Sequence, residues 1–408
     1  MIPSKINSYI IGKQIGKGSN GFVYEAIHEK TKIKVAIKMI QKTNISSDHD
    51  QIQLRFSREI NLLQRINHIF VPQFYQVIED PLYFYLVMEY APNGDLVALE
   101  KPVDEYTAKN IFLQLIIILE YLHYEQHIAH RDLKAENIIL DKYKNIRVID
   151  YGLSNCFTED NPQLKTACGS PHYLPPEVVK KQKYTAEVDI WSAGVLLYYI
   201  TVGHLPFESD NLQSLLEKIV YADPYFPSFI SPHLSSLLKK MLTKQPENRI
   251  TIDQIKKQEW FPTADFLRIK KLCNQINSFN DENIIDQDII GKMNDFGIET
   301  KYLKHNLILK NLTDETAAYR MLEREKLIES MKDDLRLIQC CKFEKIKKSS
   351  SESIKSIPTS TDNSNNQNHN GAKIKPFLSP RILSRNSSKL NIQKRFSHEA
   401  LSFSKKKS

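Results

Sequence analysis

The chain has 408 residues, 41% of them hydrophobic and 10% aromatic, which is ordinary for a protein that buries a substantial core. Its longest apolar stretch, at 111–122, is interrupted by Gln114 and Glu120 and falls short of the ~20 residues that a membrane span needs. The five cysteines are odd in number and lack CxxC spacing, which argues against a disulfide framework or a zinc site. No secretory signal is visible. These features predict a cytoplasmic protein and leave a nuclear location open.

The positive charge is concentrated at the C-terminal end. Residues 345–408 carry 14 Lys or Arg against 3 Asp or Glu, a net of +11, which leaves −3 of the formal +8 for the preceding residues. The Ser- and Asn-rich composition of 345–408 cannot bury enough apolar surface to fold, so we predict a disordered basic tail. Nucleic acid is not an expected partner, because the rest of the chain is slightly negative.

Short β-branched or aromatic runs dominate the first hundred residues and predict a small, mostly antiparallel sheet with one helix at about 52–66. The predicted strands are 9–16, 21–29, 34–40, 74–80 and 84–90. The turn-like stretch 91–96 then leads to longer apolar patterns typical of helices, at 107–126, 189–203, 212–221 and 234–243. We therefore expect a β-rich small lobe followed by a helical large lobe, an α+β architecture.

A glycine-rich stretch, GKGSNGFV from Gly16 to Val23, lies between the first two strands. On its own it fits a hairpin turn or a dinucleotide-binding loop, but the latter needs a helix where FVYEAIHE predicts a strand. The next strand carries Lys38 within an apolar alternation, where burial without an anionic partner would be costly. Glu59, in the predicted helix, is a candidate partner that would orient the ammonium toward phosphate oxygens. The alternative is that Glu59 and its neighbour Arg58 are charges on an exposed helix face.

Two further motifs follow at suitable distances: HRDLKAEN at 130–137 and DYG at 150–152, the latter after the strand-like NIRVID. With the motifs above, this ordered set resembles the eukaryotic protein kinases over residues 9–262. The resemblance implies the bilobal kinase fold and transfer of the ATP γ-phosphoryl group with Mg²⁺. It assigns catalytic roles to Asp132, Lys134, Lys38 and Glu59, and metal binding to Asn137 and Asp150. The implied ATP-binding residues are Ile15, Gly16, Lys17, Gly18, Ser19, Asn20, Gly21, Val23, Ala36, Lys38, Met88, Glu89, Tyr90 and Ile139.

Lys134 and the segment CGSPHYLPPE at 168–177 resemble the serine/threonine kinases of the calmodulin-kinase group. Within that group the chain is similar to the AMP-activated and microtubule-affinity-regulating kinase branch. The resemblance implies an activating phosphosite at Thr166, modified by an upstream kinase, with Arg131 pairing its phosphate. It also implies a structural ion pair between Glu177 and Arg249. Two residues depart from the pattern: Tyr151 replaces the usual Phe, and Pro175 replaces the usual Ala.

Asp95 and Glu136 stand where related kinases bind a basic substrate residue, so we predict Ser/Thr sites in a basic context. The alternative is that both are ordinary solvated carboxylates with no role in substrate binding. Ser384, Ser387 and Ser397 in the tail are candidate autophosphorylation sites. A pseudokinase scaffold that binds nucleotide or partner proteins is the alternative function, although it would be free to lose the motif residues that are present.

Three short predicted helices, 284–297, 299–311 and 313–326, resemble the ubiquitin-associated-like module of this branch, which we place at 281–326. The resemblance implies an intramolecular contact with the kinase domain and a regulatory role. A stabilising extension and ubiquitin capture are the alternatives. A longer amphipathic helix is expected to follow to about residue 342. For the tail, weak contact with anionic membrane or calmodulin and a nuclear-targeting role stand beside simple disorder.

Overall fold

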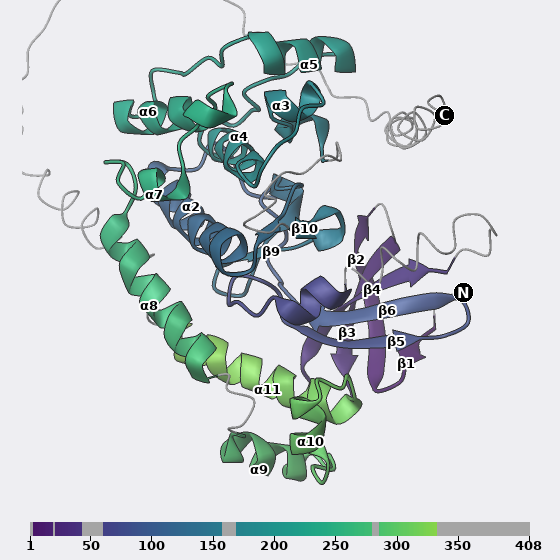
Figure 1. Cartoon of the computed structure of the whole chain (residues 1–408). Helices are drawn as coiled ribbons and strands as arrows, with labels where there is room; N and C mark the ends of the chain where they lie inside the picture. Colours follow the sequence, from purple (N-terminus) through teal and green to yellow (C-terminus); the bar gives the residue numbers. More distant parts are fainter. Residues whose placement is uncertain (1–2, 19–20, 43–59, 157–168, 280–284, 333–408) are drawn as a thin grey trace, which may run out of the picture. The chain divides into compact units, whose positions relative to one another are not determined.

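The computed structural model describes residues 3–18, 21–42, 60–156, 169–279 and 285–332. Its first part is an antiparallel sheet with the strand order β1-β2-β3-β4-β6-β5 (Figure 1). The strands are β1 (Lys5–Ile6), β2 (Tyr9–Gly18), β3 (Gly21–His28), β4 (Lys34–Gln41), β5 (Phe74–Glu79) and β6 (Tyr83–Glu89). The five predicted strands are confirmed, and residues 60–65 form the described end of the predicted helix.

The period of two along β4 divides its side chains between two faces. Val35, Ile37 and Met39 join one apolar cluster, whereas Ile40 joins another that contains Leu86 and Phe84. Both faces are therefore covered, which explains why the strand is buried along most of its length. Lys38 has the same parity as Ile40, so it lies on the face opposite Val35, Ile37 and Met39.

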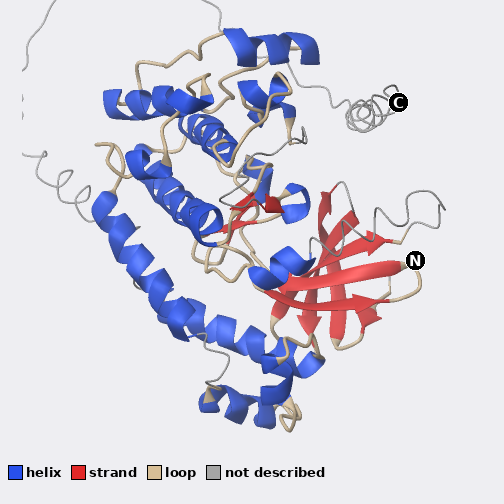
Figure 2. Ribbon diagram, viewed as in Figure 1, coloured by secondary structure: helices blue, strands red, loops and turns tan. Residues whose placement is uncertain are grey.

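The large lobe is mainly helical (Figure 2). Its helices are α2 (Glu105–Glu120), α3 (Pro176–Val179), α4 (Val188–Val202), α5 (Leu212–Tyr221), α6 (Pro232–Met241), α7 (Ile252–Ile255) and α8 (Thr263–Phe279). Short strands pair as β7 (Ile128–Ala129) with β10 (Asn155–Cys156) and β8 (Ile138–Leu140) with β9 (Ile146–Val148). Helices α2 and α4 are apolar on nearly every side, which is typical of buried helices, and they lie in one core with Trp191 and Trp260. The predicted kinase-like architecture of two lobes is confirmed.

Helix α8 was not assigned from the sequence, although its pattern is helical. Phe266, Ile269 and Cys273 recur at spacings of three and four and are all buried. The helix begins directly after Pro262, where the predicted kinase domain ends. None of the described helices is long and apolar enough to cross a membrane.

After the large lobe come α9 (Gln287–Asp295), α10 (Leu303–Ile308) and α11 (Asp314–Ser330). Asp286 caps α9, and Thr313 forms a capping box with Thr316 at the start of α11. Helix α11 continues past Lys326 to Ser330, so the third short helix and the described start of the expected longer helix are one continuous helix. The predicted extension beyond residue 332 and the tail lie outside the described residues.

These three helices share an apolar core with the small lobe. Ile289, Met293, Leu303, Ala317 and Met321 are fully or nearly fully buried in one cluster with one face of the sheet. Near the other end of α11, Leu327 and Ile328 pack against the core of the large lobe, and the C-cap residue Met331 belongs to that core. One helix thus contacts the apolar cores of both lobes.

Candidate active site

Asp132 is held by four hydrogen bonds that fix both oxygens of its carboxylate. The backbone N–H and the hydroxyl of Ser170 donate to Oδ1 at 3.0 Å each. The Lys134 ammonium and the Asn137 amide donate to Oδ2 at 2.7 and 3.1 Å. Lys134 also donates to the Ser170 hydroxyl at 2.9 Å. These bonds bring a carboxylate, an ammonium and a hydroxyl together. Asp132 is only 6% exposed, so the group is largely shielded from solvent. The sequence assigned no catalytic-site role to Ser170, although CGSPHYLPPE contains it.

Asp189 on α4 anchors the loop that carries Asp132. Its carboxylate accepts the backbone N–H groups of His130 and Arg131 and the side chain of His123, each at 2.8 Å. Burial alone would raise the pKa of Asp189, but its bonds with His123 and its other donors keep that pKa below the usual range. Arg131 adopts a positive φ of 70°, a costly conformation that the surrounding bonds hold in place.

Asn137 and Asp150 are the candidate metal ligands. The Asn137 amide donates to the backbone oxygen and to Oδ2 of Asp132, which leaves its own carbonyl oxygen as an acceptor for a cation. Asp150 has a left-handed backbone with φ 66° and is partly exposed. Among the described residues no group of three His, Cys, Asp or Glu could hold a metal by itself. One carboxylate and one amide oxygen suit Mg²⁺, which usually completes its shell with water and substrate phosphates.

The predicted nucleotide residues come from five strands and the segment after β6. In the glycine hairpin, Gly16 pairs with Val23 and Lys17 pairs with Phe22. Ala36 pairs with Met88, and Lys38 pairs with Val23 and Leu86 in the same sheet. Tyr90 follows β6 directly, Ile15 lies on β2, and Ile139 lies on β8, where it bridges to Asp95. Ser19 and Asn20 lie outside the described residues.

Gly21 is a position where only glycine fits without movement. A Cβ atom there would lie 1.9 Å from the backbone oxygen of Met39, and φ is 156°. We expect Gly21→Ala to strain the hairpin by about 1–3 kcal/mol and to raise the KM for ATP. Gly16→Ala is the matched control in the same hairpin, because its Cβ would be 3.5 Å from the nearest atom. An ATP titration of both variants checks this, and equal KM values would contradict it.

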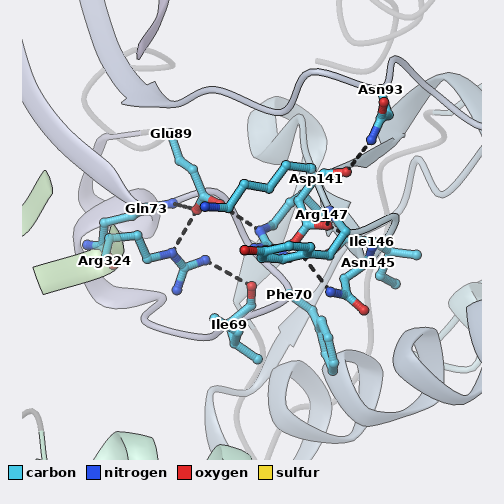
Figure 3. Close-up of polar contacts among 12 residues, drawn as sticks. Ile69, Phe70, Gln73, Glu89, Asn93, Asp141, Asn145, Ile146, Arg147 and Arg324 are labelled. Carbon is cyan, nitrogen blue, oxygen red and sulfur yellow. Dashed lines mark hydrogen bonds and ion pairs between the residues drawn. The ribbon is translucent and has the colours of Figure 1, made fainter. Parts of the chain in front are cut away.

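Glu89 was predicted to bind ATP, but its side chain belongs to a buried ion-pair network (Figure 3). Its two oxygens accept from Nε of Arg147 at 2.9 Å and Nε of Arg324 at 2.8 Å. Arg147 also pairs with Asp141 at 3.0 Å, and Arg324 donates to the backbone oxygens of Ile69 and Val71. The Glu89 side chain is therefore occupied by this network, and any contact of this residue with a nucleotide would have to involve its backbone. The sequence assigned no role to Arg147, Asp141 or Arg324.

The charges of this network control the ionisation of neighbouring groups. Burial would raise the pKa of Glu89, but Arg147 and Arg324 hold it below its usual value. His68 is buried nearby, and its burial together with the same two arginines lowers its pKa to about 3. His68 is therefore neutral in the folded protein at physiological pH. The network joins α11 to the strand that leads into the large lobe.

Tyr151, which replaces the usual Phe, places a hydroxyl group in a packed position. It is 2% exposed and packs edge-on against His130, and its hydroxyl has no hydrogen-bond partner among the described residues. Burial raises the pKa of its hydroxyl, so the group stays protonated.

We expect Tyr151→Phe to raise the free energy of unfolding by about 1 kcal/mol, because it removes a buried polar group that lacks a partner. Tyr198→Phe is the control. The Tyr198 hydroxyl donates to the backbone oxygen of Tyr225 at 2.6 Å, so its loss should destabilise the protein. Denaturant unfolding distinguishes the two signs, and a destabilised Tyr151→Phe variant would show that the hydroxyl has a partner.

The remaining predicted site residues have the following positions in the structure. Glu177 and Arg249 form two buried bonds of 2.7 and 2.9 Å in the large lobe. Asp95 accepts the backbone N–H groups of Val97 and Ala98, so one of its oxygens already stabilises a turn. Glu136 is exposed. Glu59 and Thr166 lie outside the described residues, as do the tail serines Ser384, Ser387 and Ser397. Lys38 lies on β4, where it pairs with Val23 of the glycine hairpin, and its role stays a prediction.

Comparisons with known proteins agree with this geometry. A family model described as a protein kinase domain matches residues 9–261. The SNF1-related protein kinase catalytic subunit alpha KIN12 of Arabidopsis thaliana is 35% identical over 78% of this chain and 64% of its own length. The SNF1-like protein kinase ssp2 of Schizosaccharomyces pombe is 35% identical over 79% and 55%. The carbon catabolite-derepressing protein kinase of Candida glabrata is 35% identical over 82% and 57%. The chain thus spans less than two thirds of the length of each of these relatives.

Proposed function

Because the chain belongs to the protein kinase family, we propose that it transfers the γ-phosphoryl group of ATP to Ser or Thr hydroxyls of proteins. The observation that carries this proposal is the position of Asp132, which is bonded to Lys134, Ser170 and Asn137. Asp132 would accept or orient the proton of the attacking hydroxyl, and Lys134 would stabilise charge on the transferred group. The SNF1-related names of the similar proteins support a serine/threonine kinase of that branch.

ATP and a divalent metal follow from a kinase domain, and we propose Mg²⁺ as the metal. Asn137 and Asp150 would hold it through oxygen atoms, which are the ligands that Mg²⁺ prefers. When bound, Mg²⁺ neutralises negative charge on the phosphate oxygens. Lys38 would contact the same phosphates from the small lobe.

A direct assay tests the proposed activity. Protein phosphorylated at Thr166 is incubated with Mg·ATP and a serine peptide of basic context, and phosphate incorporation is compared with Lys38→Met protein. Activity that Lys38→Met abolishes supports the kinase. Nucleotide binding without transfer would instead favour a pseudokinase scaffold, which the kinase names of the relatives do not favour.

We further propose that substrates carry a basic residue N-terminal to the target hydroxyl, bound by Asp95 and Glu136. The same assay with peptides in which that basic residue is replaced by alanine tests this preference. Unchanged KM values would leave both carboxylates without a role in substrate binding.

The three C-terminal helices are proposed to regulate the kinase by their contact with the small lobe. They cover apolar residues such as Val35, Ile37 and Met39, so removing them would expose a large part of the small-lobe core. A point substitution is therefore a sharper test than a deletion. Met293→Asp places a charge in the shared core. Altered activity at equal Thr166 phosphorylation supports regulation, whereas unchanged activity with detached helices would indicate a stabilising extension.

A further inference from the structure

Ser8, in the first hairpin of the small lobe, contacts helix α11 directly. It lies in the two-residue turn between β1 and β2, and its hydroxyl donates to Oδ2 of Asp314 at 2.7 Å. The other oxygen of the same carboxylate accepts the side-chain amide of Gln76 at 2.7 Å. Gln76 in turn accepts the hydroxyl of Tyr9 at 2.8 Å. One carboxylate on α11 therefore links the first hairpin to β5, the strand at the other end of the strand order.

Asp314 is the first residue of α11, immediately after the cap Thr313. A carboxylate is favourable there because the N-terminal end of a helix carries about half a positive charge. Both oxygens of Asp314 accept hydrogen bonds from the small lobe, so these bonds hold this end of α11 to the sheet. One of them needs the uncharged hydroxyl of Ser8 as its donor.

Ser8 also has the sequence context that the proposed kinase would favour. Lys5 stands three residues before it, in SKINSYI, and Ser8 itself is partly exposed. The three residues before Ser4, the neighbouring serine, are not basic. Strand β1 has only two residues, Lys5 and Ile6, and pairs with β2 alone at the edge of the sheet, so few hydrogen bonds oppose its local opening. Such opening would present Ser8 to a second kinase molecule.

We propose that Ser8 is a phosphorylation site and that its modification releases the N-terminal end of α11 from the small lobe. The inference rests on the proposed function, because the acting enzyme is a second copy of this chain. The Ser8 Oγ forms a bond to the γ-phosphorus of ATP, and the bond from that phosphorus to the bridging oxygen breaks. ADP leaves with the electron pair, and the hydroxyl proton passes to Asp132 of the acting copy.

The charges decide the direction of the effect. A phosphoserine carries about −1.5 to −2 charges at neutral pH and no longer offers a hydroxyl donor. The helix terminus attracts it with about +0.5 charge, whereas the Asp314 carboxylate, in direct contact with Ser8, repels it with a full negative charge. The nearby Lys5 ammonium is paired with Glu29 at 2.7 Å. Repulsion therefore exceeds attraction, and the contact opens.

The first experiment asks whether Ser8 is modified. Full-length protein active on a basic serine peptide is incubated with Mg·ATP and full-length Asp132→Asn protein as substrate, and phosphosites are mapped by mass spectrometry. We expect phosphate on Ser8 but not on Ser4, and at least about tenfold less on Ser8 when the substrate also carries Lys5→Ala. Activity on the peptide without modification of Ser8 would overturn this inference alone. Inactivity toward the peptide as well would refute the proposed function and this inference with it.

The second experiment asks whether modification releases α11. Amide hydrogen exchange is compared between full-length protein phosphorylated on Ser8 and the unmodified protein. We expect exchange over residues 314–322 to accelerate about tenfold or more, which corresponds to about 1.4 kcal/mol. Asp314→Asn should remove most of this acceleration, because it removes the repelling charge. Unchanged protection, or equal acceleration in Asp314→Asn protein, would overturn the inference.

Discussion

Asp132→Asn is expected to lower kcat by about 10²–10⁴-fold, the usual contribution of a positioned general base. Asparagine has nearly the same shape, but it cannot accept the proton of the attacking hydroxyl. Its amide would also present hydrogens to the Lys134 ammonium or the Ser170 donors, both of which now bond to the carboxylate. The ATP contacts from the small lobe are untouched, so the KM for ATP should change little. Steady-state kinetics at saturating peptide measures both quantities.

Folding must be checked separately, because the substitution weakens four bonds around a buried group. Thermal unfolding of the Asp132→Asn protein provides this check, and Asp265→Asn on the surface of α8 is the control for an Asp-to-Asn change elsewhere. A kcat within tenfold of wild type in folded Asp132→Asn protein would contradict the role of Asp132. It would also favour a mechanism in which the ATP phosphate itself takes the proton.

The strands of the small lobe were predictable because burial there follows a simple period. Val35, Ile37 and Met39 face one apolar cluster, and the alternation places Lys38 on the other face. The order of the motifs was equally informative, because each motif has a fixed place between particular strands and helices. The relation of Asp132 to Asn137 and Lys134 could be inferred from eight consecutive residues, since contacts within a short loop involve neighbours in the sequence.

Contacts between distant residues could not be predicted in this way. Arg324 and Glu89 are 235 positions apart, and in the sequence Arg324 stands among charged residues of an amphipathic helix. Nothing local distinguishes it from Lys326 two positions later, which is exposed at the surface. Arg147 did carry a signal, because it lies between the apolar residues Ile146 and Val148 in a strand, where a buried cation needs a partner. That signal indicates an acidic partner without identifying it.

Assigning Glu89 to the nucleotide site illustrates the same limit. The resemblance to kinases assigns Glu89, at the end of β6, to ATP binding, but a motif match does not distinguish a backbone contact from a side-chain contact. The direction of the side chain depends on which cations are within reach, and one of these comes from α11, outside the matched kinase domain. Only the structure of this chain shows whether the backbone or the side chain of Glu89 is available for such a contact.

Arg324→Met is expected to reduce the free energy of unfolding by about 3–5 kcal/mol, the usual effect of removing one partner from a buried ion pair. Glu89 would keep Arg147 but lose one of its two cations, and Asp141 shares the one that remains. The backbone oxygens of Ile69 and Val71 would also lose their donor. Methionine replaces most of the volume, so lost packing contributes little. Denaturant unfolding and hydrogen exchange of α11 measure the effect.

Lys326→Met on the same helix is the matched control. Lys326 pairs with Asp286 and Asp288 at the surface, so its removal should cost no more than about 1 kcal/mol. Arg324→Lys should fall closer to Arg324→Met than to wild type, because one ammonium cannot reproduce the planar set of bonds to a carboxylate and two carbonyl oxygens. If Arg324→Met and Lys326→Met were equally mild, water would have to replace the guanidinium, and α11 would be held to the lobes by apolar packing alone.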